Sequence, residues 1–347
     1  MRFLNRTVTI STVVLLTTAA WAETGKAPDP LFQNNETLQV TITAPLTTLV
    51  EKRAKEGYLP GTFRFTETDG TVVDLDLQIR TRGNFRHRTC ELPPLRLNFK
   101  KSQTDGTLFD KQNIMKLVVH CENSNNYEQI VLKEYLAYRV LNTITDLSFR
   151  VRLLRVTYID SEEQRKQQTY YAYLIEHKKR LAKRLDRKEE IIERATLGSI
   201  QSEQLNLTSI FELLISNTDF SPIAGAPGDM CCHNYVLFGN DVDPLVAIPY
   251  DFDQSGFVNA PYAAPSPNFR IRSVRTRLYR GRCFNNKYVP DSLQKFRDGS
   301  DAIYAVVDAQ EGLTSGTRKT IVKYIDKFYK LIDDPRDVEK HIIDKCI

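Results

Sequence analysis

The sequence predicts an α+β protein with a β-rich N-terminal part and a mostly helical C-terminal part. Between residues 38 and 177, short runs alternate apolar and polar side chains, which is the period of a half-buried strand. Beyond residue 178, apolar residues recur at helical spacing, most clearly over Ile321–Ile332. This change of period predicts two lobes, and two lobes form a cleft where they meet.

The composition is that of an ordinary globular protein and excludes some classes of function. Hydrophobic residues make up 41% of the 347-residue chain, charged residues 26%, and the net charge is only +5. A nucleic-acid-binding protein normally carries a stronger basic excess, so we expect no nucleic-acid partner. No later segment is apolar enough to suggest that the protein spans a membrane.

The first residues have the pattern of an export signal. Arg2 and Arg6 precede an apolar and hydroxyl-rich stretch over residues 8–18, and Ala20-Trp21-Ala22 supplies a small-x-small cleavage site. The alternative, a membrane anchor, would need about 20 apolar residues. We therefore expect a signal peptide over residues 1–22 and a secreted or periplasmic protein.

Cysteine usage agrees with export. The six cysteines are Cys90, Cys121, Cys231, Cys232, Cys283 and Cys346, and in an exported chain such cysteines form disulfides. We expect Cys90 to pair with Cys121, since both lie near the ends of strand-like runs, and Cys231 or Cys232 to pair with Cys283. The alternative, a structural zinc site, lacks a repeated C-x-x-C pair.

Individual elements follow from the apolar pattern. Strands are predicted over Leu38–Thr43, Gly61–Glu67, Val72–Arg82, Leu95–Phe99, Ile114–Val119, Val151–Ile159 and Thr169–Ile175. Helices are predicted over Tyr127–Leu141, Lys178–Thr196, Thr208–Ile215 and most of the C-terminal third. Residues 23–37 are polar and contain proline, which predicts a flexible N-terminus before a β-rich lobe over 38–177 and a helical lobe over 178–347.

Four polar residues around a predicted hairpin form a candidate metal and catalytic site. The hairpin strands are Asn234–Phe238 and Leu245–Ile248, so Asn234 opens the hairpin and Asp251 follows it. A hairpin brings its outer ends together, and oxygen ligands suit Mg²⁺ or Mn²⁺, with Asp253 as a further ligand. Asp219, just after a helix, is placed to accept a proton from a hydroxyl. Structural roles in turns and caps are the alternative.

Further residues would bind phosphates. Protein kinases use the same order of a catalytic Asp, a metal-binding Asn and a metal-binding Asp, together with a strand Lys held by a helix Glu. Lys116 in a strand and Glu134 in the next helix fit that order. The turn Arg82-Gly83-Asn84 can cradle a phosphate with its backbone N–H groups. The alternative is that Lys116 and Glu134 are ordinary strand and surface residues.

These motifs resemble the CotH (spore coat protein H) kinase-like family over roughly Leu75–Asn259. The matching segments are Arg82-Gly83-Asn84 with Pro94–Phe99, Leu132–Arg139, Tyr173–Glu176, Asn217-x-Asp219, His233-Asn234-Tyr235 and Ile248–Asp253. The resemblance implies an atypical protein-kinase-like fold that uses ATP and a divalent metal. It implies Asp219 as the catalytic acid, Asn234 and Asp251 as metal ligands, and Glu176 near the nucleotide.

The chain departs from the family after the R-G-N turn, where lysines are usual. Here Arg88 or Arg96 is the expected substitute. The expected function is an exported atypical kinase that phosphorylates a protein hydroxyl. One alternative is a catalytically inactive, kinase-like binding protein of the cell envelope, for which the arginine-rich stretch Arg270–Arg282 offers a surface unless it is merely solvated. Another is a hydrolase that uses paired Asp251 and Asp253.

Overall fold

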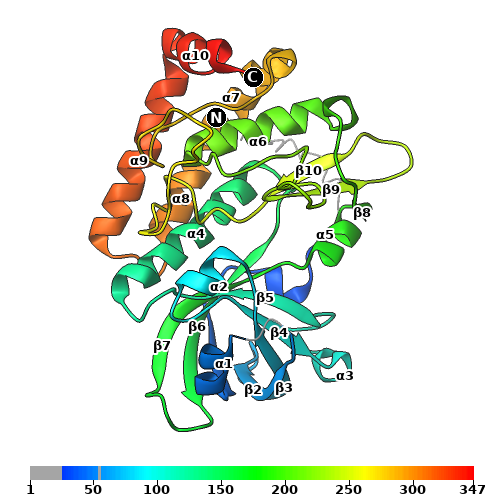
Figure 1. Cartoon of the computed structure of the whole chain (residues 1–347), viewed down its shortest axis with the longest axis vertical. Helices are drawn as coiled ribbons and strands as arrows, with labels where there is room; N and C mark the ends of the chain where they lie inside the picture. The colour runs from blue at the N-terminus through cyan, green and yellow to red at the C-terminus, as the bar shows by residue number, and fades with distance from the viewer. Residues whose placement is uncertain (1–25, 54–55) are drawn as a thin grey trace, which may run out of the picture.

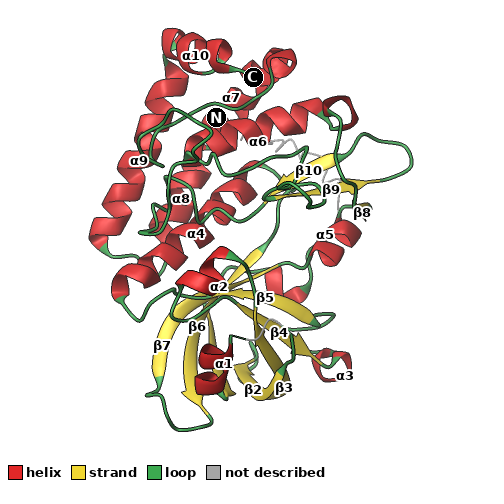
Figure 2. Ribbon diagram, viewed as in Figure 1, coloured by secondary structure: helices red, strands yellow, loops and turns green. Residues whose placement is uncertain are grey.

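The computed structural model describes residues 26–53 and 56–347 and has the predicted α+β architecture. A β-barrel occupies one end of the molecule and most helices occupy the other (Figure 1). Figure 2 shows the same division, with the long strands gathered below the helices. The predicted signal peptide lies outside the described residues.

Seven strands form the closed barrel. They are β1 (Leu38–Ala44), β2 (Leu59–Thr66), β3 (Val72–Thr81), β4 (Leu95–Phe99), β5 (Ile114–Val118), β6 (Val151–Asp160) and β7 (Gln168–Ile175), in the spatial order β1-β2-β3-β4-β5-β7-β6. Neighbouring strands are antiparallel from β1 round to β6, and a parallel pairing of β1 with β6 closes the barrel. Alternate side chains fill the interior, where the Phe63 and Phe99 rings meet edge to face with centroids 5.2 Å apart.

The helices and a small sheet make up the rest. Short helices α1 (Leu46–Lys52), α2 (Phe85–Thr89) and α3 (Lys101–Thr104) decorate the barrel, and α4 (Asn125–Ile144) lies between β5 and β6 in sequence. The helical part contains α5 (Lys178–Arg184), α6 (Ser202–Ile215), α7 (Val289–Asp298), α8 (Ser300–Ala309), α9 (Ser315–Asp333) and α10 (Pro335–His341), with β8 (Lys188–Glu190), β9 (Tyr235–Gly239) and β10 (Val246–Pro249). No helix in the described part of the chain is long and apolar enough to cross a bilayer.

Helix α4 connects the two parts. Its buried side chains belong to the same apolar cluster as those of α6 and α9, although the chain returns to the barrel after it. The Tyr138 ring on α4 lies 4.6 Å from the Phe252 ring, centroid to centroid. The helical core therefore begins inside the segment that the sequence assigns to the β-rich part.

Residues 178–196 do not form the single helix that their spacing predicts. Helix α5 ends at Arg184, and Asp186 adopts a left-handed conformation with a φ of 52°. The chain then forms β8, which pairs with β9. The edge strand β9 of the β9–β10 hairpin presents its backbone N–H and C=O groups, and β8 pairs with them. The periodicity of residues 178–196 alone does not predict this long-range pairing.

The segment 26–37, predicted to be flexible, is docked against the protein. Leu31 and Phe32 are buried in the barrel cluster. Asp29 accepts a hydrogen bond from Arg180 Nε at 2.6 Å, and the Lys26 N–H donates to the Arg184 carbonyl at 2.9 Å. The prediction of a flexible segment was wrong because it relied on the polar composition, whereas the apolar Leu31 and Phe32 help to dock the segment.

The disulfides confirm one expected pair and correct the other. Cys90 bonds to Cys121 as predicted, whereas Cys283 bonds to Cys346, and Cys231 bonds to its neighbour Cys232. The C-terminal tail lies beside Cys283, because the Cys283 N–H donates to the Ile347 carbonyl and the Ile347 N–H donates to Gly281. Only the tertiary fold brings these segments together.

We expect the Cys90–Cys121 bond to be a major source of stability. The sequence separation is 31 residues, and the chain-entropy model gives about 3–4 kcal/mol for such a loop. A Cys90→Ala/Cys121→Ala double variant should lose about that much free energy of unfolding in urea titrations under oxidising conditions. The difference from wild type should disappear once both proteins are reduced. An equal stability of the two oxidised proteins would contradict the expectation.

Candidate active site

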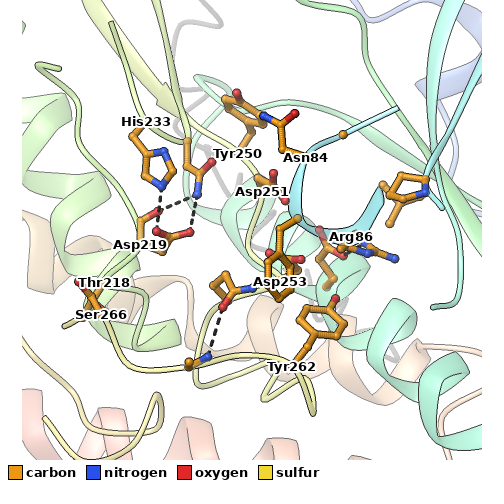
Figure 3. A pocket seen from close by; sticks show the side chains of 18 of the residues that line it. Asn84, Arg86, Thr218, Asp219, His233, Tyr250, Asp251, Asp253, Tyr262 and Ser266 are labelled. Atoms are coloured by element: carbon orange, nitrogen blue, oxygen red, sulfur yellow. Dashed lines mark hydrogen bonds and ion pairs between the residues drawn. The ribbon is translucent and has the colours of Figure 1, made fainter. Parts of the chain in front are cut away.

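A cleft of about 620 Å³ lies between the barrel and the helical part (Figure 3). Its walls come from the turn after β3, from β5 and α4, from the loop after α6, and from the two ends of the β9–β10 hairpin. Eight of the predicted site residues line it: Arg82, Asn84, Lys116, Glu134, Asp219, Asn234, Asp251 and Asp253. Segments separated by well over 100 residues in sequence thus meet at one place.

The loop after α6 fixes the backbone of Asp219. Helix α6 ends at Ile215, and the next residue, Ser216, adopts a left-handed conformation with a φ of 51°. The Asn217 N–H then donates to the Glu212 carbonyl at 2.9 Å. The Asn217 side chain accepts the Asp219 N–H at 3.0 Å. Asp219 therefore leaves the helix in a closed turn that points its side chain into the cleft.

Two neighbours orient the Asp219 carboxylate, as Figure 3 shows. His233 Nε2 lies 2.8 Å from Oδ1, and Asn234 Nδ2 donates to Oδ2 at 3.1 Å and to the Asp219 carbonyl at 2.7 Å. The hydrogen bond to Asp219 raises the pKa of His233. The Asp219 side chain is still 41% exposed, so it is held in place while remaining accessible to a ligand.

The hairpin brings Asn234 and Asp251 to the same edge of the cleft. Pro249 on β10 pairs with Tyr235 on β9, and the Tyr250 N–H donates to the Asn234 carbonyl at 3.0 Å. Asn234 and Asp251 both have positive φ values, 54° and 64°. Non-glycine residues in this region cost conformational energy and are enriched at functional sites.

Carboxyl groups accumulate on one wall of the cleft. Burial raises the pKa of Asp253 well above its usual range, and the Asp251 and Glu134 carboxyls add to the increase. Burial also raises the pKa of Glu134 to about 7. Within residues 26–53 and 56–347, no group of three or more His, Cys, Asp or Glu side chains is arranged to hold a metal ion. Any cation here would therefore need other oxygen donors, such as the Asn234 amide.

Positive charge in the cleft comes from the barrel and the turn after β3. Glu134 forms an ion pair with Arg86, with Oε2 3.5 Å from Nη1, and Arg86 also donates to the Val119 carbonyl. Lys116, predicted as the partner of Glu134, instead places its ammonium 4.8 Å from the centre of the Tyr250 ring. Burial lowers the pKa of Lys116 to about 8, and the charge of Arg82 contributes.

The short turn before α2 explains why Arg86 reaches Glu134. Gly83 has a φ of 91°, a conformation that glycine adopts most readily, and the chain reverses there into α2. The Cys90 N–H at the end of α2 donates to the Arg86 carbonyl at 2.9 Å, and Cys90 is fixed by its disulfide. The expected substitutes are placed differently, since Arg88 is exposed and Arg96 lines a neighbouring cavity.

Glu176 does not line this cleft. Its carboxylate is buried and forms a two-pronged ion pair with Arg184, with distances of 3.0 and 2.9 Å, and it also accepts the Arg150 N–H. Glu176 borders an adjacent cavity of about 670 Å³ that shares Lys116 and Tyr250 with the cleft. Its side chain joins the end of β7 to α5 and is occupied by that structural contact.

Sequence reasoning missed two residues of the site. Arg86 lies two positions after Asn84, but nothing in the local pattern distinguishes it from Arg88. His233 stands next to Asn234, and its role became apparent only from its contact with Asp219. Proximity to a predicted motif was therefore the only available signal for either residue.

Comparisons with known proteins do not assign this chain to a family. No model of a known protein family matches it, and none of the curated proteins matches it. The resemblance to CotH proteins therefore stays a prediction from the motifs.

A buried acid beneath the Asp219 loop gives this site a testable pH dependence. Burial raises the pKa of Glu212 to about 8, partly offset by the neighbouring Asn217 amide and Tyr235 hydroxyl. In the unfolded chain a glutamate titrates near about 4.3. Between these two values the folded state binds more protons, so this group lowers the free energy of unfolding as the pH rises towards 8.

We expect Glu212→Gln to remove this decrease in the free energy of unfolding with rising pH. The variant should exceed wild type in free energy of unfolding by about 2–4 kcal/mol at pH 8 and show no such advantage near pH 4, as measured by urea unfolding across this range. Glu203→Gln, which changes an exposed acid on the same helix, is the matched control and should show no comparable gain. A gain for Glu212→Gln that is independent of pH would contradict the assignment.

Proposed function

We propose that this protein is an exported atypical kinase that transfers the terminal phosphoryl group of ATP to a protein hydroxyl with the help of Mg²⁺ or Mn²⁺. One observation supports this above all others. A single cleft collects Asp219, the hairpin pair Asn234 and Asp251, and a group of basic side chains that includes Arg82 and Lys116. Its volume of about 620 Å³ is within the range of small-ligand sites.

The closed seven-stranded barrel is not a feature of protein kinases, so support for the proposal comes from the order of the elements along the chain. Strand β5 carries Lys116, the next long helix α4 carries Glu134, and the catalytic and metal-binding candidates follow in the helical part. Protein kinases place a lysine and a glutamate in the same succession ahead of their catalytic and metal-binding loops. On this proposal, β1 and β2 are additions that close an N-terminal sheet into a barrel.

The cation is inferred from the types of side chain at this edge of the cleft, not from an arranged ligand cluster. Carboxylate oxygens of Asp251 and Asp253 and the amide oxygen of Asn234 are the ligand types that Mg²⁺ and Mn²⁺ prefer. Mg²⁺ usually takes only one or two carboxylates from the protein and completes its shell with water and phosphate oxygens. When bound, the cation would neutralise charge on the phosphates.

Asp219 would act on the acceptor. It takes the proton of the attacking hydroxyl as the new oxygen–phosphorus bond forms, and the bond to the β-phosphate oxygen breaks to release ADP. The contacts from His233 and Asn234 keep the carboxylate oriented for that proton. Arg82 and Lys116 supply positive charge at the phosphates, where fixed charges stabilise the transition state.

A second candidate is a catalytically inactive binding protein that uses the same cleft. The partners of Lys116 and Glu134 favour it. In the described structure, Lys116 lies over the Tyr250 ring and Glu134 pairs with Arg86. Active protein kinases need the lysine–glutamate pair. ATP is also scarce outside the cytoplasm, where an exported protein acts.

Nucleotide binding can be tested by thermal melting of the oxidised mature protein with ATP, with and without Mg²⁺ or Mn²⁺. A ligand at 100 times its Kd stabilises the folded state by about 2.7 kcal/mol, so Tm should rise when ATP and metal are present together. Asp251→Asn should abolish the metal-dependent part of the rise. Asp241→Asn, at the exposed far turn of the same hairpin, should behave as wild type. No rise at millimolar ATP with either metal would refute a nucleotide site.

Catalysis can be separated from binding with Asp219→Asn. This variant should keep the rise in Tm but lose about 10²–10⁴-fold in phosphoryl transfer, because it removes a proton acceptor. The measurement is incorporation of labelled phosphate into a protein acceptor. Wild-type protein that binds ATP with metal but transfers no phosphate to any acceptor would decide for the inactive binding protein.

A further inference from the structure

Two adjoining cavities outside the candidate active site share a half-buried lysine. Their volumes are about 510 and 240 Å³, and both are lined by Lys133 of α4 and by Asn259. The first also contains Arg272 and the second also contains Arg275. We call this pair of cavities the Lys133 site.

The charge in the Lys133 site is uncompensated. None of the residues described along either cavity wall is an aspartate or glutamate. Lys133 is half-buried, and its ammonium donates to the neutral carbonyl of Val258. Burial, together with the charge of Arg275, lowers the pKa of Lys133 to about 8. A partly buried cation without an acidic partner is costly, and an anion would offset that cost.

The neutral polar side chains around the three cations are amides and hydroxyls, each of which can donate a hydrogen bond to an anion. Asn126 and Ser273 line the first cavity, and Thr317 and Thr320 line the second. Asn126 lies in the first turn of α4, and Thr317 lies in the first turn of α9. The positive ends of two long helices therefore border the cavities and add to the attraction for an anion.

We propose that the Lys133 site binds a phosphate-type oxyanion. Lys133 lines both cavities, and Arg272 and Arg275 each line one of them. A tetrahedral, multiply charged oxyanion suits a lysine and an arginine in one cavity better than a single carboxylate does, because it offers more acceptor oxygens and more charge. The phosphate is either free or carried on a phosphorylated side chain. The site contains none of the candidate catalytic residues, so the proposal does not depend on kinase activity.

Calorimetric titration with inorganic phosphate, at constant ionic strength set by chloride, tests this site in the mature protein. Wild type should bind, and Lys133→Met, which keeps the aliphatic stem, should weaken the Kd at least tenfold. Lys327→Met, an exposed lysine of α9, is the charge-matched control and should bind as wild type does. Arg272→Met is a second variant that should also weaken binding. Its side chain is exposed, so the test survives if Lys133→Met folds poorly.

A parallel titration with N-acetyl-phosphoserine amide distinguishes the two sources of the phosphate. Tighter binding than inorganic phosphate, lost in Lys133→Met, would assign a phosphorylated side chain; equal or weaker binding would assign the free anion. Absence of binding by both probes would overturn the proposal. So would binding that Lys133→Met and Arg272→Met leave unchanged, since the anion would then occupy another surface.

Discussion

The buried ion pair between Arg86 and Glu134 is the interaction on which the cleft depends. Arg86 belongs to the barrel and Glu134 to α4, so the pair joins the two parts of the molecule across the wall of the cleft. It also supplies the positive charge that opposes the accumulation of carboxyls at Asp253 and Glu134. Without this pair, the buried Glu134 and Asp253 would lie near Asp251 with no cation in contact with Glu134. Such an arrangement is costly in a low-dielectric site.

Local pattern predicted most of the elements that form this site. The strands were predicted to within a few residues, and the β9–β10 hairpin correctly placed Asn234 and Asp251 at neighbouring ends because strand pairing is a short-range constraint. The pairing of β1 with β6, which closes the barrel, was not predictable, since it joins segments more than 100 residues apart. The contact between Arg86 and Glu134, which are 48 residues apart, is also beyond the reach of local pattern.

The failures share a physical cause. Residues 26–37 and 188–190 are polar, yet both are ordered by partners from distant segments: the barrel cluster for Leu31 and Phe32, and the edge of β9 for β8. Likewise, Cys346 reaches Cys283 only because the tail packs beside Gly281. The composition of a segment indicates whether the segment would be ordered by itself. These segments are instead ordered by surfaces that exist only after the rest of the chain has folded.

The contacts of Glu176 and of the N-terminal segment fasten one corner of the molecule. Glu176 clamps the end of β7 to Arg184 of α5, and Asp29 joins Arg180 of the same helix to Gln112 near the barrel. Both contacts converge on the corner where the chain passes from the barrel into the helical part. Charged and polar side chains, rather than apolar packing alone, therefore fasten this corner. The N-terminal segment is thus a structural tie between α5 and the barrel, not a mere leader to the first strand.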